Sequence, residues 1–363
     1  MENNEPHNEV TQGEANPPRQ SVKHEVAQEI IEAMKQGDTP WQKPWIASAM
    51  KPRNGATDNE YRGVNRILLS LAGQGMAGQA WSDPRFVTFH QAAANGWKVK
   101  KGEKGQMIVK VVDLQDPQKS GRADLQSTSK GEGGDNSKGS DADRDQENGR
   151  ADSSKRFVLK RYFVFNAQQV AGMPPLPVVT AQPEFAPIDN AEAVINALKE
   201  KTGLLVVHGG NTACYIPATD EVRLPHKQSF KSVYGYYSTA LHEASHSTLS
   251  ERRLNRTEAL GKKWGDAAYA HEELRAEISS AILAAETGVP IGQDADHIGQ
   301  HASYVNSWIK AIQDDPMVIF SAAKDADQMA SYLLTLAREH VVMKKHKEWV
   351  AEYDGALAPG LQH

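Results

Sequence analysis

Apolar residues recur at every fourth position near the start of the chain, at Val22, Val26, Ile30 and Met34. Residues with this spacing lie on one face of an α-helix, so the pattern predicts an amphipathic helix over 22–34. Gly37 ends the pattern. Residues 1–20, which precede the helix, are polar and rich in proline and asparagine. That composition predicts a disordered tail.

Extended and helical patterns alternate through the next part of the chain. "VNRILLSLAGQGM" predicts a short helix, and "RFVTFHQAAANGWKVKKGEKGQMIVKVVDL" predicts a strand, a helix and then two strands around the "KKGEKG" turn. "RFVLKRYFVFNAQQV" is dense in β-branched and aromatic residues, and we expect it to pair with "MIVKVVDL". Between these two strands, residues 115–155 have almost no large apolar side chain and mix both charges with glycine and serine. They predict a flexible polar insertion.

A proline-rich segment, "GMPPLPVVTAQPEFAP", separates this region from a largely helical one. "IDNAEAVINALKEKTG" predicts a helix in which Asp189 is the N-cap, Glu192 completes a capping box and Gly203 marks the end. Three short strands are expected in "LLVVHGG" and "ACYIPATDEVRL". The remaining sequence predicts four helices, at about 231–255, 265–287, 297–313 and 316–345.

Strands followed by helices indicate an α+β fold. A chain of 363 residues with 39% hydrophobic residues has enough apolar material for two modest cores. We therefore predict two domains, an α+β domain followed by a mainly helical domain with a small sheet. The expected boundaries are a tail at 1–20, a first domain at 21–174, a linker at 175–187, a second domain at 188–347 and a tail at 348–363.

The composition bears on the cell compartment and on the kind of metal site. The single cysteine, Cys214, cannot form an internal disulfide. This fits a reducing compartment and leaves any metal to be held by histidine, aspartate and glutamate. The start "MENNEPHNEV" has neither a basic stretch nor an apolar core, and nowhere do 18 apolar residues follow one another. We therefore expect a cytoplasmic protein with no membrane partner.

The stretch "YYSTALHEASH" carries His242, Glu243 and His246 in the order H-E-x-x-H. On a helix the two histidines lie one turn apart on one face and reach the same ion, whereas Glu243 is offset and can act as general base toward a metal-bound water. A catalytic site of this kind needs a third protein ligand. We expect Glu273 of "AYAHEELRAEISSAIL" to be that ligand, with Glu277 accepting a hydrogen bond from a ligand histidine. The alternative is that these glutamates lie on a solvated helix face.

Charge is unevenly distributed along the chain. The net charge is −5, yet residues 21–113 contain 13 lysines and arginines and nine aspartates and glutamates, which gives this segment a net charge of +4. Aromatic and basic residues are interleaved there, and this combination holds single-stranded DNA by stacking on bases and neutralising phosphates. The residues predicted to contact single-stranded DNA are Trp41, Trp45, Tyr61, Arg62, Arg66, Trp97, Lys98, Lys100, Lys101 and Lys104. The alternative is that the tryptophans are core residues and the lysines cover a hairpin.

The chain resembles the ArdC antirestriction family in two sets of sequence blocks. The first set, "YRGVNRILL", "GWKVKKGEKG" and "FNAQQVAGMP", is similar to the family's amino-terminal single-stranded-DNA-binding domain, which also begins some conjugative plasmid primases. The second set is similar to the zincin-like metallopeptidase domain that follows, and consists of "LPHKQSF", "YYSTALHEASH", "RLNR", "YAHEELRAEISSAIL" and "HASYVNSWI". The blocks keep their order over most of residues 20–345. The resemblance implies a gluzincin-like site, single-stranded DNA binding and protection of incoming plasmid DNA from host restriction.

The resemblance also assigns roles to single positions. It makes Zn²⁺ the expected cofactor, with Mn²⁺ or another divalent ion as the alternative. His242 and His246 match the family's metal ligands, Glu243 its catalytic glutamate and Glu273 its third ligand. In the DNA domain, the recurrent block of the family is matched by Tyr61, Arg62, Gly63 and Asn65, and this match adds Asn65 to the residues expected to contact single-stranded DNA.

Three functions stay open at this point. The first is an antirestriction protein that combines single-stranded DNA binding with a metal-dependent peptidase-like site. The second is a non-enzymatic DNA-binding protein whose metal is structural. The third is a regulatory metalloprotease that cleaves one repressor. An intact Glu243 favours an enzyme, because a structural metal site has no use for a general base.

Overall fold

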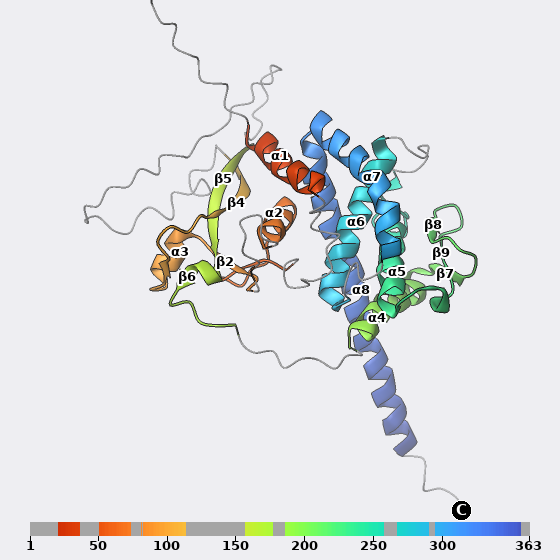
Figure 1. The fold of residues 1–363 in the computed structure, drawn as a ribbon. Coiled ribbons are helices and arrows are strands. Elements are labelled where there is room, and N and C mark those ends of the chain that lie inside the picture. The colour runs from red at the N-terminus through yellow and green to blue at the C-terminus, as the bar shows by residue number, and fades with distance from the viewer. Residues whose placement is uncertain are drawn as a thin grey trace, which may run out of the picture.

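The computed structural model describes residues 21–36, 51–73, 81, 83–113, 157–176, 186–257, 267–289 and 295–356. Figure 1 shows a sheet-containing amino-terminal region beside a helical carboxy-terminal region. The predicted α+β class and the two-domain layout are confirmed. The predicted tail at 1–20, the polar insertion at 115–155 and most of the linker lie outside the described residues.

The amino-terminal sheet is built on two long strands. They are β4 (Gln106–Asp113) and β5 (Phe157–Asn166), which pair antiparallel from Gln106↔Val164 to Asp113↔Phe157. The predicted pairing of these segments is therefore confirmed. Two short strands, β1 (Arg53–Asn54) and β2 (Arg85–Val87), complete the order β1-β2-β5-β4.

Three helices belong to the same region. α1 (Val22–Lys35) buries the predicted apolar stripe, and α2 (Val64–Gly73) is also apolar on its buried face. The short helix α3 (Phe89–Ala94) begins in a capping box formed by Thr88 and Gln91.

The predicted strands around the "KKGEKG" turn exist, but they do not pair with each other. β3 (Lys98–Val99) pairs with β6 (Val170–Ala171), and the Lys100 N–H extends this ladder to the Gln169 carbonyl at 2.9 Å. β5 occupies one edge of β4, and on the other edge the Asn65 side chain binds the backbone at Val109. The Asn65 amide bonds both the N–H and the C=O of Val109, each at 2.8 Å.

The carboxy-terminal region begins with α4 (Ala186–Thr202) and a small three-stranded sheet. The strands β7 (Leu205–His208), β9 (Glu221–Leu224) and β8 (Cys214–Ile216) lie in the order β7-β9-β8. Four helices follow: α5 (Val233–Ser247), α6 (Ala267–Thr287), α7 (Ala295–Asp314) and α8 (Met317–Ala356). No helix of the described residues is long and apolar enough to cross a membrane.

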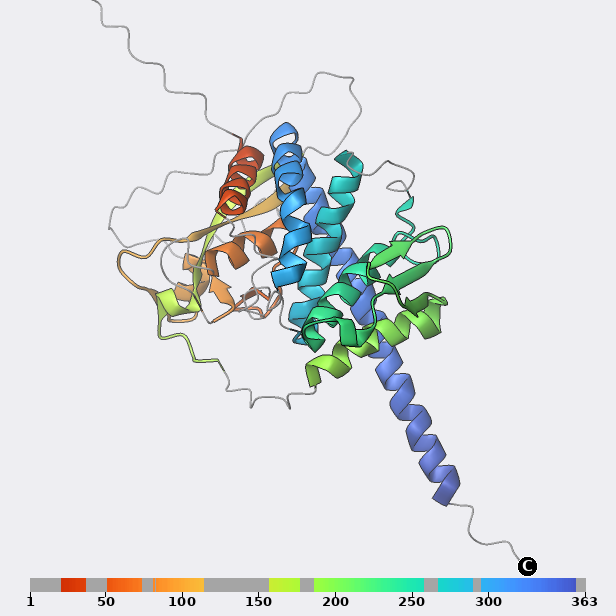
Figure 2. The ribbon, with the colours of Figure 1, turned by 45° about the vertical axis from the view of Figure 1, so that its right-hand side comes forward.

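Three boundaries differ from the sequence prediction. α4 begins at Ala186, so Asp189 lies in its first turn and is not the cap, and Glu192 instead accepts hydrogen bonds from Tyr237 and Lys227. α5 ends at Ser247, because hydroxyls of its last residues bond backbone carbonyls and the chain turns back through 248–256. α8 continues to Ala356, into the predicted tail, and runs past the rest of the body in both views (Figures 1 and 2).

The two domains share one main core. α1 packs against α7, and α2 packs against α8. Buried residues of both domains, among them Ile30, Leu68, Leu241 and Trp308, belong to one cluster. The main cluster spans both domains because α1 and α2 bury apolar faces against the helical domain as well as against their own sheet. Two smaller clusters, around Phe86 and around Val87, lie within the amino-terminal domain.

Polar contacts cross the same boundary, which we call the interdomain seam. Arg66 of α2 lies 3.2 Å from Asp327 of α8, and the Gly63 N–H also donates to this carboxylate. Lys51 forms an ion pair with Glu286 at 3.1 Å.

Candidate metal centre and candidate nucleic-acid surface

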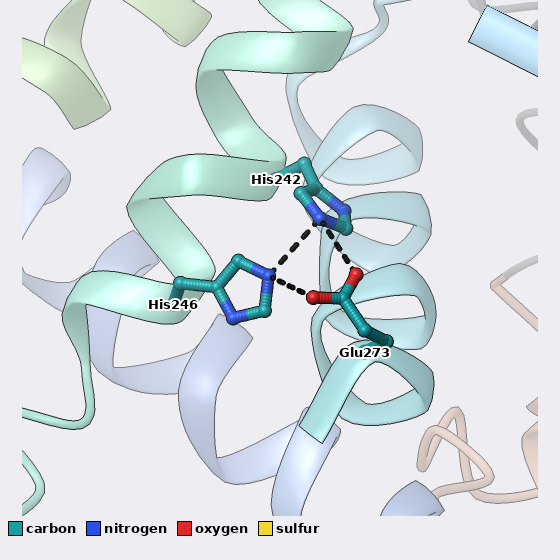
Figure 3. A group of neighbouring side chains, drawn as sticks. All are labelled: His242, His246 and Glu273. Carbon is teal, nitrogen blue, oxygen red and sulfur yellow. Dashed lines mark hydrogen bonds and ion pairs between the residues drawn. The ribbon is translucent and has the colours of Figure 1, made fainter. Parts of the chain in front are cut away.

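α5 presents both histidines of the H-E-x-x-H motif to α6. Ser232 caps the helix by accepting the Gly235 N–H at 3.0 Å, and Leu241 and Ala244 are buried in the core. This anchors the helix so that His242 and His246 project toward α6 from its buried side (Figure 3).

Three side chains converge between these helices. The Nε2 atoms of His242 and His246 lie 3.1 Å apart, and the two Glu273 oxygens lie 3.6 Å and 3.5 Å from them (Figure 3). One ligand atom from each residue falls within 4.8 Å of the others. The structure thus brings together the three residues expected to bind metal. Two imidazole nitrogens and one carboxylate oxygen form a donor set that suits a divalent transition metal.

The second ring nitrogen of each histidine, Nδ1, lies near a further carboxylate. His242 Nδ1 lies 3.3 Å from Glu277, the partner expected from the sequence. His246 Nδ1 lies 3.5 Å from Glu272, which the sequence reasoning did not assign. Such carboxylates fix the tautomer that leaves Nε2 free to bind an ion. Two ligand histidines call for two such partners, and α6 carries four glutamates, so the sequence indicates a second partner but not which glutamate supplies it.

Glu272 is itself held by an arginine from the segment after α5. The Arg256 guanidinium donates to both Glu272 oxygens, at 2.7 Å and 3.0 Å, and also to the Thr248 hydroxyl at 2.8 Å. Arg275 lies 3.6 Å from the same carboxylate. Because a two-pronged guanidinium contact restricts the carboxylate to one plane, Arg256 fixes the position of Glu272.

The electrostatics of this cluster favour a cation. Burial alone would lower the pKa of His246, but the carboxylates of Glu272 and Glu273 outweigh burial and hold that pKa well above its usual value. Burial would raise the pKa of Glu273, but hydrogen bonds from the two histidines bring it far below its usual range. The carboxylates around the two imidazoles therefore create a negative potential, which is the environment that a bound divalent ion requires.

Glu243 and Tyr269 complete the surroundings of the cluster. Glu243 is buried, and its charge adds to burial in raising the pKa of the Cys214 thiol on β8. Cys214 itself is half-buried. Burial, followed by a hydrogen bond with Tyr304 and the charge of Glu273, raises the pKa of Tyr269. Tyr269 thus adjoins the cluster, although no sequence motif marks it.

Several residues expected to contact DNA have structural contacts instead. Only 4% of Arg66 is exposed, and its guanidinium faces Asp327 and Glu60. Asn65 holds the edge of β4. Trp97 is half-buried against Val87, Ala92 and Val170. Tyr61 is half-buried, and its hydroxyl accepts a hydrogen bond from Asn54 at 3.2 Å. Trp41 and Trp45 lie outside the described residues.

The remaining basic candidates lie on the surface. Arg62 is exposed at the start of α2, and Lys98, Lys100, Lys101 and Lys104 are exposed on β3 and on the turn that follows it. Lys100 donates to the Gln168 carbonyl at 2.7 Å, which ties the turn to the segment before β6. We call Lys98, Lys100, Lys101 and Lys104 the basic turn.

Two family models match the chain in the order of its domains. The N-terminal domain of anti-restriction factor ArdC matches residues 20–165, and a zincin-like metallopeptidase matches residues 191–325. The metal-free crystal structure of the antirestriction ArdC protein from the R388 plasmid has a TM-score of 0.62 at 30% identity, covering 88% of this chain and 98% of that one. The chain belongs to the ArdC antirestriction family. The Mn(II)-bound structure of the same ArdC protein has a TM-score of 0.61 at 29% identity, covering 87% of this chain and 98% of that one.

Three further relatives match most of this chain but differ in how much of their own length the match covers. The uncharacterized protein y4eC of Sinorhizobium fredii is 31% identical over 315 residues, which are 85% of this chain and 90% of that protein. A DNA primase TraC of Escherichia coli is 36% identical over 343 residues, 92% of this chain but 29% of the primase. A second TraC primase is 37% identical over 336 residues, 89% of this chain and 20% of the primase. The chain spans less than a third of the length of either primase.

Proposed function

We propose that this chain binds single-stranded DNA and carries a metal-dependent peptidase-like site, and that it protects incoming plasmid or phage DNA in the cytoplasm of the receiving cell. The observation that carries the metal part is the convergence of His242, His246 and Glu273, with a carboxylate behind each imidazole. Zinc fits this donor set, and manganese is the alternative because an ArdC relative was solved with Mn(II) bound.

The residues of the site have distinct roles in this proposal. His242, His246 and Glu273 hold the ion, which when bound supplies Lewis acidity toward a carbonyl and an acidified water. Glu277 and Glu272 orient the two imidazoles by accepting hydrogen bonds from their Nδ1–H groups. Glu243 takes a proton from the attacking water on a carboxylate oxygen and gives it to the leaving amine nitrogen. Glu243 is buried beside the ligands, where little water competes for that proton.

The DNA part of the proposal rests on the basic turn and on Arg62. Their positive charges are exposed, and in the described residues none of Arg62, Lys98, Lys101 and Lys104 has a carboxylate partner in an ion pair. Exposed cations attract phosphates, and the affinity for DNA should therefore fall steeply with salt. Arg66 and Asn65 are left out of this surface because their polar atoms are engaged inside the protein.

Two other functions compete with this one. A DNA-binding protein with a structural metal needs the same ligands but no base at Glu243. A regulatory protease that cleaves one repressor uses the same site and differs only in its substrate. The presence of Glu243 next to the ligands favours an enzyme over a structural metal site.

One experiment separates these functions. Cells carrying Glu243→Gln, or the triple variant Lys100→Glu, Lys101→Glu and Lys104→Glu, are scored for protection of incoming unmodified DNA from restriction. Glu243→Gln keeps the size of the side chain but removes the base, so metal content and DNA affinity should persist while peptide hydrolysis collapses. If Glu243→Gln protects fully and the lysine variant fails, protection depends on DNA binding and not on proteolysis. Full protection by both variants would contradict both parts of the proposal.

A further inference from the structure

Phe163 of β5 is an exposed aromatic residue beside the basic turn. It exposes 55% of its surface and lies opposite Met107 on β4. The turn comes close to it at Gly105, where an added Cβ would lie 3.0 Å from the Phe163 Cβ and 3.3 Å from the Phe165 ring. A glycine at this position therefore lets the turn lie directly against the strand that carries Phe163.

A second exposed phenylalanine lies where β2 ends beside β5. Val87 of β2 pairs with Phe165, and Thr88 is still extended, with φ −73° and ψ 160°. The antiparallel β2–β5 register, continued two residues past Val87, reaches Phe163, so α3 begins at Phe89 beside that position. Phe89 is 60% exposed. Two exposed apolar rings, bordered by lysines, form a surface that the protein's own core does not cover.

The charges around these rings are unbalanced. Glu103 is the only acidic residue of residues 98–105, and its carboxylate accepts a hydrogen bond from Gln169 at 2.9 Å. In the described part of the chain, Lys98, Lys101 and Lys104 have no ion-pair partner. The surface thus combines exposed aromatic rings with uncompensated positive charge, which is the chemistry that single-stranded nucleic acid requires.

We propose that Phe163, with Phe89 beside it, is a platform on which bases of single-stranded DNA stack while Lys101 and Lys104 contact the phosphates. This proposal rests on the DNA binding proposed above and adds the residues that distinguish single-stranded from double-stranded DNA. In a duplex both faces of each base are covered by neighbouring base pairs, whereas a single strand can turn a base onto an exposed ring. The aromatic platform therefore gives the basic turn its preference for single strands.

The test compares two oligonucleotides that differ only in their bases. The full-length protein is titrated, by fluorescence anisotropy at one salt concentration, with a thymidine oligonucleotide and with an abasic strand of equal length. The wild type should bind the thymidine strand more tightly. Phe163→Ala should lose about 10-fold in affinity for it, because one stacked base contributes about 1–3 kcal/mol, and should leave affinity for the abasic strand unchanged. Phe163→Trp should restore the preference.

The chain offers a matched control at the far end of the same strand. Phe157 is 60% exposed and lies opposite Asp113, away from the basic turn. Phe157→Ala should leave both affinities unchanged. The slope of affinity against salt should also be the same in Phe163→Ala as in the wild type, since no phosphate contact is lost. Unchanged melting temperature and metal content would show that the variants are folded.

The possible outcomes separate this proposal from the one on which it rests. If the wild type prefers the thymidine strand and Phe163→Ala keeps that preference, the platform is wrong and DNA binding stands. If the wild type binds both strands equally, stacking is absent and the platform is again wrong. If neither strand binds, the proposed DNA function itself fails.

Discussion

Charged side chains have different surroundings in the candidate metal centre and on the basic turn. In the candidate metal centre the histidines, Glu272, Glu273, Glu277 and Arg256 are buried or half-buried and contact one another, as in the series His246, Glu272 and Arg256. On the basic turn the lysines are exposed, and in the part of the chain described Lys101 and Lys104 have no carboxylate partner.

This difference reflects the partner that each region fits. A metal ion has no shape of its own, so the protein must supply the whole geometry and hold it rigidly. A nucleic-acid strand brings a regular row of charges and adapts to the surface, so flexible lysines suffice. Substitutions in the metal centre should therefore cost more than substitutions of similar size on the basic turn.

The largest effect is expected at a metal ligand. His246→Ala should abolish stable metal binding, because two remaining protein ligands hold a divalent ion far more weakly than three. Metal analysis of the purified protein after dialysis measures this, and affinity for single-stranded DNA should be unchanged. Glu273→Ala should have the same effect. Full metal content in Glu273→Ala, with loss in Glu277→Ala, would show that the third ligand is the other glutamate.

Arg66 and Arg62 test the comparison within one sequence block. Arg66→Met should lower the free energy of unfolding by about 3–5 kcal/mol, because it leaves the Asp327 carboxylate buried without its cation. Burial raises the pKa of Asp327, and the charge of Arg66 is the largest effect that opposes it. Urea unfolding measures the change.

Arg62→Met is the control, because Arg62 is exposed. It should leave stability nearly unchanged and weaken DNA binding. If Arg66→Met instead keeps its stability and loses DNA affinity, Arg66 contacts DNA and the prediction is wrong.

A smaller effect is expected at a residue that contacts a candidate metal ligand but does not itself bind the ion. Glu272→Gln should reduce metal affinity by about 10–100-fold, since the amide can no longer hold the His246 imidazole as a carboxylate does. Competition with a metal-binding dye measures the affinity, and the visible spectrum of the cobalt-loaded protein reports the ligand geometry. Glu251→Gln, an exposed glutamate in the segment after α5, is the control. Equal affinities in the two variants would exclude an orienting role for Glu272.

The smallest effect is expected at a single surface lysine. Lys101→Gln should reduce the slope of log affinity against log salt by about 0.7, the value for one phosphate contact on a single strand. Its affinity at one salt concentration should fall only slightly, and its stability should not change. Titrations at several salt concentrations measure the slope. An unchanged slope would remove Lys101 from the DNA surface.

The candidate metal ligands could be predicted from the sequence because their geometry is local. The spacing of His242 and His246 places them on one face of one helix, and Glu273 follows on the next helix. The role of Glu272 was not readable, because it depends on how α6 is turned against α5. Nor was the contact from Arg256, because the chain folds back after Ser247 where a continuous helix was predicted.

The DNA surface was harder to predict, because it depends on which faces the fold covers. Periodicity shows that α2 has an apolar face, but it does not show that Arg66 points across the interdomain seam toward Asp327. Alternation along β5 separates its two faces, but only the packed structure shows that Phe163 stays exposed. Three tryptophans were predicted to contact DNA because of their residue type. Trp97 is the one of these three that lies in the described residues, and it is half-buried against the core.

The pairing of Asp113 with Phe157 has a practical consequence. β4 ends and β5 begins at paired positions, so we expect changes in the length of the sequence between them to leave the β4–β5 register unchanged. Closing a longer loop costs little, about 0.6 kcal/mol for each doubling of its length. This point is therefore a natural place to attach a reporter domain or a tether in the amino-terminal domain, with the metal ligands held on helices of the other domain.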